Sequence, residues 1–173
     1  MASDIKTKYP ATSSVAITCA IASLASDTNL LAGRASTAVD NTTNLDLDHL
    51  VSGLITAGTS PTVGTTIEVW AYAYRTIASG TPTYPDSITG TDANKTMTSA
   101  NVKNAALRLV AVITVDNTSN RGYEFPPTSI AGLYGGSMPP FYGLFIVHNT
   151  GVALNSTGGN HILHYERVQA QTV

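Results

Sequence analysis

The side chains able to do chemistry are few in this sequence and lie far apart along it. The histidines are His49, His148, His161 and His164. His161 and His164 are three residues apart, and a straight strand places such residues on opposite faces. We therefore do not expect them to chelate one metal ion. Cys19 is the single cysteine, which excludes an internal disulfide and a cysteine-based zinc site.

The acidic residues offer the next possible site, because four aspartates fall close together at Asp27, Asp40, Asp46 and Asp48. Asp46 and Asp48 would share one face of a strand and could ligate calcium together with loop carbonyls. The spacing does not match an EF-hand loop, which needs a glycine at its sixth position and a closing glutamate. A solvated face or turn-capping role is the favoured interpretation, and we predict neither a bound metal nor a cofactor.

Catalytic motifs are not found. Ser137, within Gly-Gly-Ser-Met-Pro at 135–139, lacks the Gly-x-Ser-x-Gly pattern of a nucleophile elbow. The glycine-containing segment 58–65 has no lysine and does not read as a phosphate loop. The eleven acidic residues are too dispersed to nominate the pair that glycosidase chemistry requires. The chain is therefore predicted not to be an enzyme.

Composition limits the partners. The chain has 173 residues, of which 43% are hydrophobic and only 12% charged, so a packed core is expected under a surface of hydroxyls and amides. The net charge is −2 and the basic residues do not cluster, which argues against nucleic-acid binding. No apolar run approaches the ~20 residues of a membrane span, so no membrane partner is predicted.

The elements that must position these residues are predicted to be β-strands. Apolar and polar residues alternate with period 2 at 45–56, with Leu45, Leu47, His49 and Val51 on one face, and again at 67–75. The segment 106–115 is apolar on both faces and is expected in the middle of a sheet. Further strands are predicted at 15–22, 141–148 and 161–169, with a short edge strand near 96–99 and a possible helix within 99–108.

These elements predict an all-β fold. Residues 1–14 read as a polar N-terminal arm, and 15–173 as a single domain. Its strands and long irregular connections favour a two-sheet β-sandwich of Greek-key or jelly-roll type with about eight strands. The arm contains Ile5 and Tyr9, which could anchor it on a partner.

One strand carries a row of aromatic residues, Trp70, Tyr72 and Tyr74, opposite the aliphatic face of Ile67, Val69, Ala71 and Ala73. If the aliphatic face is buried, the aromatic row is a possible platform for a protein or for sugar rings. If the row is buried, it forms core between the sheets, and this is the favoured interpretation.

Several stretches together resemble the capsid cement, or decoration, proteins of tailed bacteriophages. They lie at 23–44, 67–74 (Ile-Glu-Val-Trp-Ala-Tyr-Ala-Tyr), 139–147 (Pro-Pro-Phe-Tyr-Gly-Leu-Phe-Ile-Val) and 164–169. The resemblance implies a jelly-roll structural protein of the virion, made in the host cytoplasm and placed on the outer capsid surface. Such a protein would clamp neighbouring subunits of the major capsid protein and form homo-oligomers, as dimers or trimers. The family supplies no catalytic residues.

The candidate partner interface combines the arm residues Ile5 and Tyr9 with aromatics near the proline- and glycine-rich segment 126–140. These are Phe125, Tyr134 and Phe141. Aromatics on a surface loop either fold back onto the core or await a partner. The alternative function is a carbohydrate- or receptor-binding module of the phage-fibre type, which would use the row at Trp70, Tyr72 and Tyr74.

Overall fold

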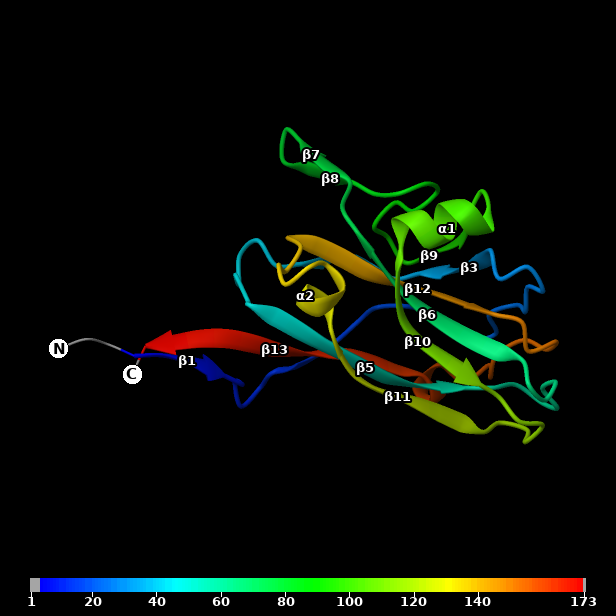
Figure 1. Cartoon of the computed structure of the whole chain (residues 1–173). Helices are drawn as coiled ribbons and strands as arrows, with labels where there is room; N and C mark the ends of the chain where they lie inside the picture. The colour runs from blue at the N-terminus through cyan, green and yellow to red at the C-terminus, as the bar shows by residue number, and fades with distance from the viewer. Residues whose placement is uncertain (1–3, 173) are drawn as a thin grey trace.

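Two antiparallel β-sheets pack face to face in the computed structural model, which describes residues 4–172 (Figure 1). The first sheet has the order β1-β13-β5-β11, and β2 also pairs with β13. Its strands are β1 (Ile5–Lys8), β2 (Ser14–Ala16), β5 (Asp48–Thr56), β11 (Gly122–Ser129) and β13 (Ile162–Thr172).

The second sheet has the order β10-β6-β12-β3-β9, and β4 also pairs with β12. Its strands are β3 (Ala32–Ala35), β4 (Val39–Asp40), β6 (Thr66–Ala73), β9 (Ala93–Thr96), β10 (Arg108–Thr114) and β12 (Phe141–His148). The remaining elements are the hairpin β7 (Thr76–Ala78) and β8 (Thr81–Thr83), the helices α1 (Ala100–Ala106) and α2 (Ile130–Leu133), and the 3-10 turn η1 (Gly158–Asn160). The prediction of an all-β sandwich is confirmed, and the jelly-roll connectivity stays a prediction.

The main core lies between the two sheets and follows from the alternation in their central strands. On β6, Ile67, Val69 and Ala71 have no exposed surface, and they meet Val51 and Ile55 of β5. Ile67, Val69 and Ala71 are two positions apart from one another, because a strand points every second side chain to the same face. The period-2 pattern predicted at 67–75 is therefore the pattern that builds the core.

A second apolar cluster lies on the outer face of the second sheet. The helix α1 and the segment before it cover this face, burying Tyr72, Met97, Leu107 and Phe145. The predicted helix within 99–108 is confirmed, and the Ser99 hydroxyl caps it by accepting a hydrogen bond from the Val102 N–H.

The aromatic row of β6 is consequently covered, although the aliphatic face is also buried. Tyr72 has no exposed surface and its hydroxyl donates to the Ser36 carbonyl at 2.7 Å. Trp70 is half-buried, with the Lys103 ammonium 4.8 Å from the centre of its ring. Both faces of β6 are core, so the row lies in the second cluster and not between the sheets.

Several predicted elements have other positions or lengths. The strand predicted as central at 106–115 is β10, which forms an edge of the second sheet and leaves Leu109 42% and Val112 51% exposed. The strand predicted at 15–22 is reduced to β2, and the edge strand predicted at 96–99 lies earlier, at β9.

The strand predicted at 45–56 begins only at Asp48. Leu45 has a positive φ of 52°, which ends regular pairing before the strand. Leu45 and Leu47 are 74% and 53% exposed while His49 and Val51 are buried, so the four residues predicted to share one face do not share it.

Candidate functional site

A two-stranded ribbon projects from one end of the sandwich (Figure 1). It is formed by β1 and the last residues of β13, with Ile5 opposite Thr172 and Lys8 opposite Gln169. All four residues of β1 are exposed, because β5 begins opposite Val168 and no third strand within residues 4–172 accompanies the ribbon beyond that point. A two-stranded ribbon is only marginally stable in water on its own.

The ribbon exposes large apolar side chains. Ile5 is 75% exposed and Tyr9 is 63% exposed. Leu45 and Leu47 lie near its root, where the Leu47 N–H donates to the Val168 carbonyl. The arm predicted at 1–14 is thus extended at β1 and paired with the C-terminal strand of its own chain, and residues 1–3 lie outside the described residues.

A buried polar network fixes the root of the ribbon. The Asp46 carboxylate accepts a two-pronged contact from Arg167, with Nε at 2.8 Å and Nη2 at 3.1 Å. The Gln169 amide donates to it at 2.7 Å and His49 Nε2 at 2.9 Å. Because Arg167 and Gln169 belong to β13, one carboxylate ties the ribbon strand to the body.

The electrostatics of this network explain its charge state. Burial acts to raise the pKa of Asp46, but hydrogen bonds from Arg167, His49 and Gln169 outweigh it and lower the pKa to about 2. Burial lowers the pKa of His49, which keeps the ring neutral. Neutral His49 then donates through Nε2 to Asp46 and accepts at Nδ1 from the Tyr142 hydroxyl at 2.9 Å.

The favoured interpretation of the aspartates was a solvated face or a turn-capping role. Asp27 and Asp40 do accept hydrogen bonds from backbone N–H groups that follow them, but Asp46 is not solvated, since its side chain has no exposed surface. The calcium alternative also loses its ligands. The Asp46 oxygens are occupied by Arg167, Gln169 and His49, and the Asp48 oxygens accept from Ser129, Ala131 and the His49 N–H. No group of three or more acidic, histidine or cysteine side chains within residues 4–172 is arranged to hold a metal.

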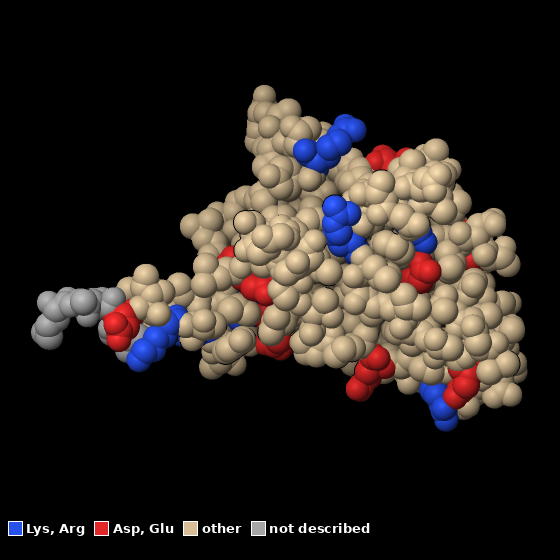
Figure 2. Space-filling model, viewed as in Figure 1, with Lys and Arg blue, Asp and Glu red and all other residues tan. Residues whose placement is uncertain are grey.

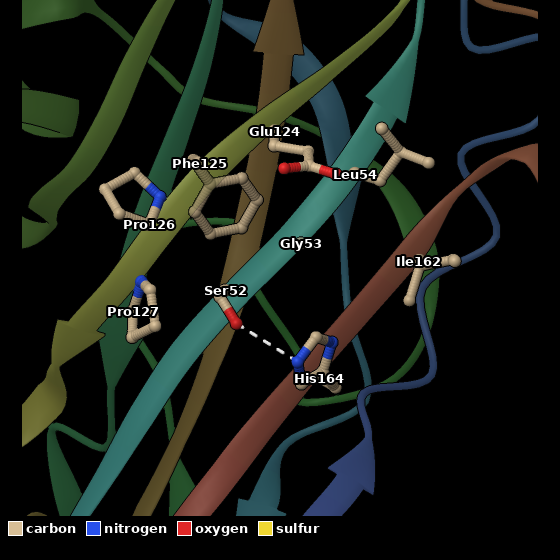
Figure 3. A pocket seen from close by; sticks show the side chains of 9 residues that line it. All are labelled: Ser52, Gly53, Leu54, Glu124, Phe125, Pro126, Pro127, Ile162 and His164. Atoms are coloured by element: carbon tan, nitrogen blue, oxygen red, sulfur yellow. Dashed lines mark hydrogen bonds between the residues drawn. The ribbon is translucent and has the colours of Figure 1, made fainter.

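A hollow of about 600 Å³ opens on the outer face of the first sheet (Figure 3). Its lining comes from β5, β11 and β13. Leu54 and Ile162 form apolar walls, Pro126 and Pro127 form another, and Glu124 stands at the rim. Ser52 hydrogen-bonds to His164 Nε2 at 3.1 Å across two strands.

The shape of the hollow follows from close strand packing at Gly53 and from a bulge in β11. Gly53 has no side chain, and a Cβ there would lie 2.4 Å from the Ile162 carbonyl and 2.9 Å from the Phe125 ring. On β11 the register with β5 shifts between Phe125 and Thr128, so that Pro126 and Pro127 bulge out of the ladder. Pro126 and Pro127 therefore border the hollow, while Gly53 allows β5 to pack closely against β13 and Phe125 at its base.

The Ser52–His164 pair resembles two members of a nucleophilic triad, but its surroundings do not complete one. No described carboxylate hydrogen-bonds to the other ring nitrogen of His164 to orient it. The adjacent Pro126 and Pro127 have no N–H groups to form an oxyanion hole. Ser52 and His164 alone therefore do not make up a catalytic triad.

A second hollow, of about 530 Å³, lies where β6 ends beside α2. It is lined by Tyr74, Arg75, Tyr134 and Met138 together with prolines. Tyr134 faces inward, where its hydroxyl donates to the Ala71 carbonyl at 3.1 Å and burial raises its pKa.

The predicted interface aromatics are therefore folded back onto the body. Phe125 is 3% exposed and lies in the main core, not on a loop. Tyr134 packs against the main core and Phe141 against the second cluster, and both are half-buried. Of the five predicted interface residues, Ile5 and Tyr9 are the ones with large exposed surfaces.

Charged groups are sparse on the surface. Figure 2 shows acidic and basic side chains scattered singly over the face in view. No helix within residues 4–172 is both long and apolar enough to span a membrane. No family model, curated protein or solved structure matches the chain.

Proposed function

We propose that this protein is a non-enzymatic structural protein that binds other protein subunits through its ribbon, as a cement protein on the outside of a phage capsid. The observation that carries the proposal is the ribbon of β1 and β13, which extends beyond the sandwich with Ile5 and Tyr9 exposed. Natural proteins seldom leave a strand pair bare, because its unpaired edges invite pairing with another chain.

The edges of the ribbon support a docking role. Beyond Val168, β13 has β1 on one side and, in the described part of the chain, no strand on the other, so its backbone groups on that side can pair with a partner strand. A partner strand could extend the ribbon by main-chain hydrogen bonds while side-chain pockets give specificity. The capsid as partner, and a dimer or trimer as the assembled form, follow from the sequence resemblance.

The alternative of a sugar-binding module has lost its platform. It required Trp70, Tyr72 and Tyr74 to present one open row, and Tyr72 has no exposed surface. Trp70 is also engaged, since its Nε1 donates to Glu68 at 2.8 Å beneath Lys103. No other described feature favours this alternative.

The test compares binding to assembled shells with stability. Capsids assembled from the major capsid protein of the same virus are mixed with the protein and sedimented. The double variant Ile5→Ala with Tyr9→Ala should lower shell affinity by about tenfold or more, as expected when exposed anchors are removed, while the melting temperature stays unchanged.

Val63→Ala is the matched control, because Val63 is 68% exposed and lies in the β5–β6 turn at the opposite end of the sandwich. It should leave shell occupancy intact. Equal occupancy for the wild type and the double variant would exclude the ribbon as the docking element.

A further inference from the structure

The hollow on the outer face of the first sheet is suited to a long side chain with an apolar stem and a positive end. Leu54, Ile162 and Pro126 offer aliphatic walls, and Glu124 supplies one carboxylate at the rim. None of the ion pairs within residues 4–172 includes Glu124. Lysine lays its methylene stem along apolar surface while keeping its ammonium at the edge.

The chain carries two lysines that match this description. Arg34, Lys103, Arg121 and Arg167 are each engaged in an ion pair within their own chain. Of the three lysines outside these pairs, Lys95 is half-buried on β9, whereas Lys6 and Lys8 are exposed on β1. They are two positions apart, so they project from one face of the strand, opposite Ile5 and Thr7.

The ribbon cannot reach the hollow of its own molecule. Ile162 and His164, which line the hollow, lie on the same continuous strand as Gln169 to Thr172, which pair with β1. From His164 to Gln169 the strand advances by roughly 17 Å. Figure 1 shows β13 continuing beside β1 beyond the sandwich, away from the part of β13 that pairs with β5. The occupant must therefore come from another molecule.

Resting on the proposed role of the ribbon as a docking element, we propose that the Lys6 and Lys8 face of β1 lies in the hollow of a second copy of this chain. The lysine stems pack on Leu54, Ile162 and Pro126, and an ammonium group pairs with Glu124. Asp4 precedes the two lysines, so the segment from Asp4 to Lys8 keeps a net charge of +1 against the acidic rim. One basic segment and one acidic hollow in each chain make the contact self-complementary between copies.

This contact divides the ribbon into two working faces. The lysine face joins copies of the protein to one another. The face with Ile5 stays free for the shell, as the proposed function requires. Reciprocal exchange between two copies gives a dimer, and one-way exchange gives a closed ring such as a trimer.

The test is sedimentation velocity of the full chain over a range of protein and salt concentrations. The wild type should self-associate, more weakly as salt is raised, because the pairs lie at a solvent-accessible rim. Glu124→Gln should weaken association by up to about fivefold, and Glu124→Lys or the pair Lys6→Glu with Lys8→Glu should weaken it further. Lys95→Glu on β9, a lysine outside the ion pairs of its own chain, is the control and should have no effect.

The decisive variant combines Glu124→Lys, Lys6→Glu and Lys8→Glu in one chain. It should restore association, since the swapped charges are again complementary between copies. The proposal would be overturned if the wild type is monomeric at all concentrations, or if the single-site charge reversals do not change self-association. It would also be overturned if the combined variant does not regain self-association.

The readouts separate this inference from the proposed function. Ile5→Ala with Tyr9→Ala should lower shell binding and leave self-association unchanged. Normal shell binding with no self-association would overturn the inference alone. If the protein self-associates in a way that depends on Glu124 but does not bind capsid shells, the proposed function alone would be overturned.

Discussion

His49 Nε2 lies 2.9 Å from Asp46 Oδ2, in a site where the two side chains are 1% and 0% exposed. The pair stands at the root of the ribbon, because Asp46 also holds Arg167 of β13. An ionised carboxylate that is fully buried is tolerated only when its oxygens are filled by donors. The network therefore makes the anchoring of the ribbon sensitive to any change of charge at Asp46.

Asp46→Asn should lower the free energy of unfolding by about 3 kcal/mol, because it leaves Arg167 without its buried counter-charge. Urea denaturation measures the change. Asp116→Asn is the matched control, since Asp116 pairs with Arg121 on the surface and such pairs contribute less than about 1 kcal/mol. Equal losses in the two variants would contradict a buried ionic anchor.

Stability should fall as the pH is lowered from about 7 toward 5. Burial lowers the pKa values of His49 and His148 below the usual 6.5. Between these pKa values and 6.5, the two histidines bind protons in the unfolded chain and not in the folded chain, so acidification favours unfolding. The stabilisation is present above about pH 6.5 and is lost as pH falls toward the folded pKa values.

Melting temperatures measured at pH 7.5 and pH 5 check this expectation. A loss of 1 kcal/mol at this chain length corresponds to about 2–4 °C. His49→Gln should flatten part of the slope and leave the share due to His148. A melting temperature that rises on acidification would contradict the burial of neutral histidines.

Below about pH 4 a second loss should follow. The pKa of Asp46 is lowered to about 2, so the stability it provides is present above its unfolded value of 3.8 and disappears as pH falls through about 2. Circular dichroism during acid titration would detect this step. In Asp46→Asn it should be reduced, because that variant has no carboxyl group to protonate.

Tyr134→Ala should destabilise the isolated protein by roughly 3 kcal/mol, since it removes a packed ring and leaves the Ala71 carbonyl without its donor. Tyr134→Phe keeps the ring and should cost about 1 kcal/mol. Thermal unfolding of the free protein, compared with shell occupancy, distinguishes packing from docking. If Tyr134→Ala keeps full stability but loses shell occupancy, Tyr134 belongs to the interface with the shell.

Chelation should leave the fold unchanged. The oxygens of Asp46 and Asp48 are filled by donors of the chain itself, so calcium has no open carboxylate there. Melting with EDTA should agree with melting in added calcium within a degree or two. A large shift in either direction would reopen the calcium interpretation.

The sequence predicted what depends on local alternation. The strands near 67–75 and 141–148 and the helix within 99–108 follow from patterns inside short windows, and the structure contains them as β6, β12 and α1. The position of β10 at an edge of the sheet could not be predicted from its sequence, because a strand with apolar residues on both faces fits the middle of a sheet as well as an edge.

The candidate site depended on pairs that are far apart in sequence. Asp46 meets Arg167 across 121 positions, and Ser52 meets His164 across 112. No spacing rule links such residues before the strands are paired. Leu45 and Leu47 were predicted to share one face with His49 and Val51, but they are exposed while those two are buried, because the regular strand begins only at Asp48.

The pairing of Ile5 with Thr172 arranges β1 and the last residues of β13 like the two strands of a β-hairpin. A short Asn-Gly linker from Thr172 to Ile5 would supply a turn and yield a circularised chain of residues 5–172. New ends could then be opened in the β5–β6 turn, far from the ribbon (Figure 1). Such a permutant would keep the sandwich while freeing the ribbon tip to display a grafted loop.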